Sequence, residues 1–131
     1  MAGRVLLLIL GLLNVLNGVF MLAAPGAWFA MVPGVAATGA FNAHFVYDVG
    51  MAYLASGIFL AYGFRGGRTA AIVAMTGAIW PVLHALIHID GWLTMGFPRD
   101  SQVATSEVVG VVVLSFLGAV LAWMRLQRER A

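Results

Sequence analysis

The chain has 131 residues, of which 63% are hydrophobic and only 9% are charged, and its formal net charge is +2. A mean hydropathy of +0.99 lies far outside the range of soluble globular proteins and indicates a membrane protein. Every basic residue is an arginine and most flank apolar runs, which argues against a nucleic-acid-binding surface. Because the chain has no cysteine, disulfides, thiolate metal sites and thiol nucleophiles are excluded.

Four apolar stretches are each long enough to cross a bilayer as a helix, since about 20 residues span a hydrocarbon core of about 30 Å. In chain order the expected spans are about 5–24, 43–64, 69–89 and 103–124. The sequence therefore predicts an all-α fold. We expect a single transmembrane domain over residues 1–131, built as an antiparallel four-helix bundle.

The connections between the spans differ in character. Residues 25–42 are uncharged and carry aromatic side chains suited to the headgroup level of a membrane, and Asn42 is placed to cap the second span. The short turn 65–68, Arg-Gly-Gly-Arg, makes the second and third spans antiparallel neighbours. Residues 90–102 form the last connection.

The arginines predict the orientation of the bundle. Only Arg99 lies at one end of the spans, whereas the other end has Arg4, Arg65, Arg68, Arg125, Arg128 and Arg130. The positive-inside rule then puts both termini in the cytoplasm. We expect a multi-pass protein of the cell (inner) membrane.

Two polar pairs spaced i, i+4 lie at the outer ends of the second and third spans. His44 and Asp48 share one helix face, and His84 and His88 share another. A rise of about 1.5 Å per residue puts the pairs level, with His44 opposite His88 and Asp48 opposite His84. Such a set is favoured by zinc and accepted by copper or iron. The hypothesis is that these four residues hold one metal ion.

Further polar residues lie at a similar depth. Glu107, near the start of the fourth span, is expected to act as a general base on a metal-bound water, because a metal lowers the pKa of its water to about 7. Asn14 and Asn17 on the first span, and Asp90 after the third, are expected to surround the ligands. Such a centre would act on a lipid-soluble substrate entering from the bilayer.

Two other functions fit the same residues. A haem-b or quinone-linked electron-transfer subunit would use His44 and either His84 or His88 as axial ligands. A non-catalytic accessory subunit, in a homo-oligomer or a larger membrane complex, would use the polar residues and Glu107 only as a hydrogen-bonded network. Ionisable groups inside a membrane are costly, which favours a functional site over a purely structural network.

Three stretches around these residues carry a resemblance: "PGAWFAMVPGV" at 25–35, "GAFNAHFVYDVGMAYLASG" at 39–57 and "HALIHIDGW" at 84–92. In them the chain resembles small bacterial four-helix membrane proteins that are similar in size and layout to the DoxX-like group. The resemblance spans most of the first three expected helices. It implies the four-helix membrane fold and supplies no catalytic residue.

Overall fold

The computed structural model describes residues 1–129, and every regular element in that range is a helix. In chain order the elements are α1 (Ala2–Ala23), α2 (Pro25–Met31), η1 (Val35–Thr38), α3 (Ala43–Tyr62), α4 (Arg68–Met95), α5 (Ser101–Thr105), η2 (Ser106–Val113) and α6 (Leu114–Arg128). The last three form one continuous helical run, in which η2 is π-helical. The helices long and apolar enough to cross a membrane are Ala2–Ala23, Ala43–Tyr62, Arg68–Met95 and Ser101–Arg128.

These four helices confirm the four expected spans and agree with a multi-pass membrane protein, although some ends differ. α4 continues past the expected end at residue 89, and Asp90 is helical instead of lying in a connection. The helix stops at Gly96, whose φ of 95° is a conformation that favours glycine. The connection before the fourth span is therefore only residues 96–100.

Side-chain caps fix the starts of two helices. The Asn42 side-chain oxygen accepts a hydrogen bond from the backbone N–H of Phe45 at 3.2 Å, which confirms the expected cap of α3. The Asp100 carboxylate accepts from the N–H groups of Gln102 and Val103 at 2.9 and 3.0 Å. Both caps satisfy N–H groups that have no partner within their own helix.

Helices α1 and α3 touch through their backbones at a glycine seam, formed by Gly11, Gly18, Gly50 and Gly57. A Cβ atom added at Gly57 would lie 2.6 Å from the backbone oxygen of Gly11, and one added at Gly18 would lie 2.7 Å from that of Gly50. Because Gly11 meets Gly57 and Gly18 meets Gly50, the two helices run in opposite directions. Small residues permit such close packing where apolar burial offers little gain, as inside a bilayer.

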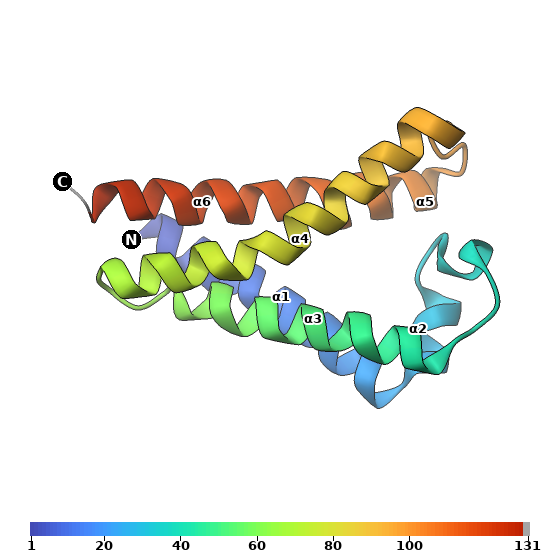
Figure 1. The fold of residues 1–131 in the computed structure, drawn as a ribbon, viewed down its shortest axis with the longest axis horizontal. Coiled ribbons are helices and arrows are strands. Elements are labelled where there is room, and N and C mark those ends of the chain that lie inside the picture. Colours follow the sequence, from blue (N-terminus) through green and yellow to red (C-terminus); the bar gives the residue numbers. More distant parts are fainter. Residues whose placement is uncertain (130–131) are drawn as a thin grey trace.

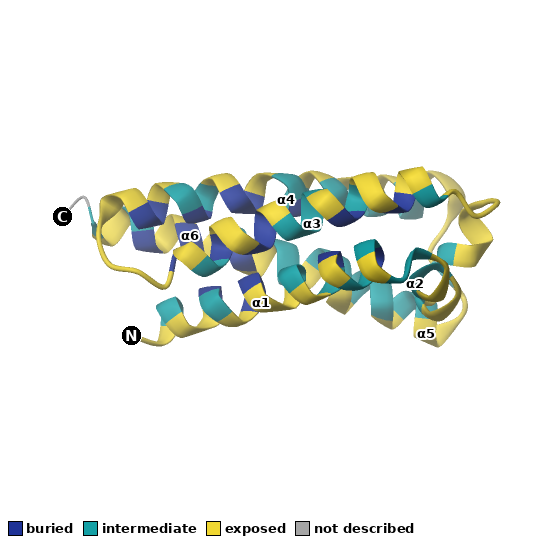
Figure 2. Cartoon of the chain, turned by 90° about the horizontal axis from the view of Figure 1, so that it is seen from below, coloured by how far each residue is buried: buried dark blue, intermediate teal, exposed yellow. Residues whose placement is uncertain are grey.

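Small residues also let α4 join this pair at the end of the molecule where α1 begins and α6 ends. Figure 2 shows buried residues concentrated in this half. A Cβ added at Gly77 would lie 2.7 Å from the Cβ of Phe59 on α3. The buried core there consists of Leu7, Leu60, Ala74, Ala78 and Ala122.

Arg125 joins α6 to the turn between α3 and α4. Its side chain is only 7% exposed and donates to the carbonyl oxygens of Gly63 and of Arg65, the latter at 2.5 Å. It also lies 3.3 Å from Glu129, which in turn lies 3.8 Å from Arg4. The guanidinium satisfies carbonyls of the turn that follows α3, and a cation at this place opposes the negative end of the α3 dipole.

At the opposite end the helices separate. Figure 1 shows α4 diverging from α3 as it rises toward α5, whereas α1 and α3 remain together. Residues 24–42, which include α2 and η1 and are called here the strap, lie at this end. A Cβ added at Gly34 would lie 2.9 Å from Val103 on α5, so the strap reaches the fourth span.

The glycine seam predicts a stability difference between two otherwise similar substitutions. Gly57→Ala should lower the free energy of unfolding by about 1–3 kcal/mol, because the new methyl group overpacks a backbone contact. Gly91→Ala is the matched control, since its Cβ meets only Met95 at 3.5 Å. Thermal unfolding in detergent micelles measures both, and equal melting temperatures would contradict the close contact of α1 with α3.

Candidate functional site

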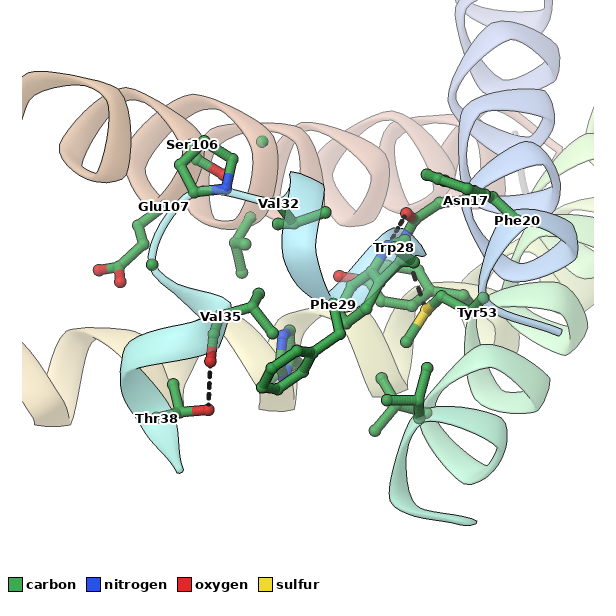
Figure 3. A pocket seen from close by; sticks show the side chains of 18 of the residues that line it. Asn17, Phe20, Trp28, Phe29, Val32, Val35, Thr38, Tyr53, Ser106 and Glu107 are labelled. Carbon is green, nitrogen blue, oxygen red and sulfur yellow. Dashed lines mark hydrogen bonds between the residues drawn. The ribbon is translucent and has the colours of Figure 1, made fainter. Parts of the chain in front are cut away.

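A cavity of about 830 Å³ lies where the helices separate. Its walls come from α1, the strap, α3, α4, η2 and the start of α6, and Figure 3 shows strap side chains between α1 and η2. The volume is within the range of about 300–1,000 Å³ typical of small-molecule sites. Most lining residues are apolar, and the polar or amphipathic ones include Asn14, Asn17, Trp28, Tyr53, His84, His88, Ser106, Glu107 and Ser115.

The polar wall of the cavity consists of His84, His88 and Glu107. The two imidazole rings have their centroids 4.9 Å apart, and Nδ1 of His88 lies 3.6 Å from Oε2 of Glu107. Behind the wall, the indole N–H of Trp92 donates to the same carboxylate oxygen at 2.5 Å. The His88 and Glu107 side chains are about one-quarter exposed. The carboxylate is therefore held in place beside an imidazole.

Aromatic stacking fixes the deeper histidine. The ring of Trp80, one turn below on α4, stacks on His84 with centroids 5.0 Å apart and planes 9° apart. Tyr53 on α3 packs edge-on against Trp80, with centroids 4.7 Å apart. Because the neighbouring rings hold its plane, His84 presents a defined ring edge to the cavity.

Glu107 belongs to η2, the π-helical part of the fourth span. A π-helix has i→i+5 hydrogen bonds, and such segments occur mostly as single-turn bulges within α-helices, frequently at functional sites. Within η2 no residue is fully buried, and the space around the Cβ position of Gly110 is open to 4 Å. The π-helical segment thus lines the cavity instead of packing tightly against the other helices.

A part-buried side-chain hydrogen bond ties the strap to α1. The indole N–H of Trp28 donates to Oδ1 of Asn17 at 2.9 Å, as Figure 3 shows. Asn14 lines the cavity as well, and its side-chain N–H group donates to the backbone oxygen of Leu10 at 2.8 Å. Both asparagines therefore line the same cavity as the polar wall.

The structure does not bring the four predicted metal ligands together. His44 and Asp48 face each other at 3.5 Å, but their side chains are 87% and 54% exposed and neither lines the cavity. The predicted pairing with His84 and His88 is not formed, and the α3 residue that packs against His84 is Tyr53, with ring centroids 6.1 Å apart. Asp90, expected near the ligands, is also exposed. Within residues 1–129, no three His, Asp or Glu side chains form a group suited to a metal ion.

The tryptophans behind the polar wall were not expected as site residues. Trp80, His84, His88 and Trp92 follow one another at intervals of four, so one face of α4 carries all of them. This spacing was a usable signal, because a tryptophan N–H inside a membrane needs an acceptor. Glu107 lies level with that face and supplies the acceptor for Trp92.

Comparison with known proteins finds no match to the chain among family models, curated proteins or solved structures. The resemblance to the DoxX-like group stays a prediction.

The bond between Trp28 and Asn17 predicts how firmly the strap is held. Trp28→Phe should speed hydrogen exchange of the backbone amides of α2 about fivefold, because a hydrogen bond contributes about 1 kcal/mol. Trp123→Phe on α6 is the control, since Trp123 is 53% exposed and has no such partner in residues 1–129. Exchange measured by mass spectrometry should change in the first variant only; unchanged exchange in both would show that the bond does not retain the strap.

Proposed function

We propose that this protein binds a lipid-soluble molecule in the cavity, with the polar part of that molecule against His84, His88 and Glu107. The observation that carries the proposal is a cavity of about 830 Å³ with mainly apolar lining and polar groups gathered on one wall. Sites for small molecules typically combine apolar walls with a few placed polar groups. A molecule dissolved in the bilayer would reach such a site by lateral diffusion.

The proposal includes the orientation in the membrane. We infer an antiparallel bundle in the cell (inner) membrane with both termini in the cytoplasm, because Arg4, Arg65, Arg68, Arg125 and Arg128 lie at the end where α1 begins and α6 ends. The positive-inside prediction from the sequence also used Arg130, which lies outside the described residues. The cavity then occupies the outer half of the bundle.

The polar wall also offers acid–base chemistry. A carboxylate beside an imidazole can accept a proton from a bound molecule or return one, and Glu107 and His88 have this arrangement at 3.6 Å. The expected role of Glu107 as a general base therefore stays a prediction, now with His88 as its neighbour. No reaction is needed for the binding function.

The metal and haem hypotheses receive no support from the described residues. His44 and Asp48 lie outside the cavity, so they do not complete a ligand set with His84 and His88. For the same reason His44 is not placed to share a haem bound in the cavity. Zinc, copper or iron binding stays a prediction, and no step of the proposed function depends on it.

A side chain that fills the cavity tests the binding function. Gly110→Trp should remove any lipid-soluble molecule that copurifies with the wild type. Gly110 lines the cavity and the space around its Cβ position is open, so the indole would occupy the volume of the bound molecule. Val109→Trp is the control, since Val109 is 49% exposed and does not line the cavity. Organic extracts of both proteins, purified in detergent, are compared by untargeted mass spectrometry.

The result separates the competing functions. A molecule present in the wild type and in Val109→Trp, but absent from Gly110→Trp, supports the proposal. An accessory subunit predicts identical extracts from all three proteins. Elemental analysis of the same samples tests the metal hypothesis, because one equivalent of metal in the wild type would revive it.

The orientation can be tested in whole cells, because the natural chain contains no cysteine. Ala37→Cys in the strap and Thr69→Cys at the start of α4 each introduce a single thiol at an exposed position. A membrane-impermeant maleimide should label the first in intact cells and the second only after permeabilisation. The reverse pattern would place the cavity in the cytoplasmic half.

A further inference from the structure

We infer that the molecule bound in the cavity is an amphiphilic organic cation, such as a protonated amine or a quaternary ammonium compound. This inference rests on the proposed binding function and adds the charge of the ligand. It follows from one property of the cavity. Among the described lining residues, Glu107 alone carries a formal charge when the histidines are neutral, and no lysine or arginine lines the cavity.

The Glu107 carboxylate can accept more hydrogen bonds than the described chain donates to it. Its Oε2 receives the Trp92 N–H and lies near His88, whereas Oε1 has no hydrogen-bond partner within residues 1–129. A carboxylate can accept about four hydrogen bonds. Removing such a charge from water is costly unless an opposite charge is near. Because the described chain supplies no arginine beside Glu107, a cationic ligand would complete the pair.

The remaining walls suit the same class of ligand. Aromatic rings attract cations through their negative faces, and the cation–π interaction strengthens when water is excluded. The aromatic residues lining the cavity are Phe20, Trp28, Phe29, Phe45 and Tyr53. An anionic headgroup would instead be repelled by Glu107, and no lysine or arginine lines the cavity to pair with it. The cavity therefore favours positive over negative amphiphiles.

Among the described residues that line the cavity, only two other groups become positively charged when they bind a proton. They are His88 and, one turn deeper, His84, both on α4. Tyr53 is the titratable residue that α3 contributes, and α1 and the strap contribute none to the lining. Protonated imidazoles would cancel the charge of Glu107. A buffer alkaline enough to keep imidazole neutral thus isolates its effect.

Tetraphenylphosphonium and tetraphenylborate test the charge directly, because they have nearly the same size and shape and opposite charge. Equilibrium dialysis in mildly alkaline buffer compares protein-containing micelles with empty ones. The wild type should bind tetraphenylphosphonium saturably and hold tetraphenylborate no better than empty micelles. Glu107→Gln should weaken tetraphenylphosphonium binding about tenfold or more, as expected for loss of a charged partner.

Two further variants keep the result interpretable. Glu129→Gln removes a carboxylate at the opposite end of the molecule and should leave binding unchanged. Glu107→Asp keeps the charge and should retain the preference for the cation. Loss of that preference in Glu107→Asp as large as in Glu107→Gln would show that the charge does not set it, and would overturn the inference.

The remaining outcomes separate this inference from the binding function. Equal binding of the two ions, stronger binding of tetraphenylborate, or tetraphenylphosphonium binding unaffected by Glu107→Gln would overturn the cation preference. If Gly110→Trp still removed a copurifying molecule, the binding function would stand. Absence of saturable binding, together with identical extracts from wild type and Gly110→Trp, would overturn both.

Discussion

The backbone contact between α1 and α3 is the constraint on which the rest of the molecule depends. Because no side chain separates Gly11 from Gly57, these helices form one rigid unit whose direction and register are fixed. α4 must then pack on this unit, and its sequence changes along its length. The half of α4 that follows the α3–α4 turn carries Ala74, Gly77 and Ala78, whereas the half nearer α5 carries Trp80, His84, His88 and Trp92. Small residues permit contact and large ones force separation, so the helices diverge.

The cavity is therefore a consequence of a gradient in residue size along α4. The divergence would expose polar groups to lipid, but the strap reaches across to α5 and is held by Trp28 and Asn17. Arg125 holds the other end closed by donating hydrogen bonds to the carbonyl oxygens at the α3–α4 turn. The end at the α3–α4 turn is closed and the opposite end is open, so the bundle has the shape of a wedge, with His84, His88 and Glu107 gathered toward its wide end.

Hydropathy was sufficient to predict the four spans, because crossing a bilayer fixes both the length and the composition of a helix. The common depth of His88 and Glu107 was predictable too, since these two side chains meet across two helices. The facing of His44 and Asp48 was not predictable, because level residues meet only if both helices are rotated toward each other and stay close. The π-helical turn at Glu107 was also beyond the sequence pattern, since its hydrophobic spacing resembles that of an ordinary helix.

That π-helical segment makes the polar wall depend on the number of residues in the fourth span as much as on their identity. A π-bulge holds an extra residue relative to a regular α-helix. Loss of a single codon within η2 would remove that extra residue and restore regular pitch without turning the flanking parts of the helix relative to each other. The widened backbone that carries Glu107 would be lost, while the rest of the fourth span would keep its facing. A change in residue number within η2 would therefore alter this wall of the cavity and leave the packing of the bundle in place.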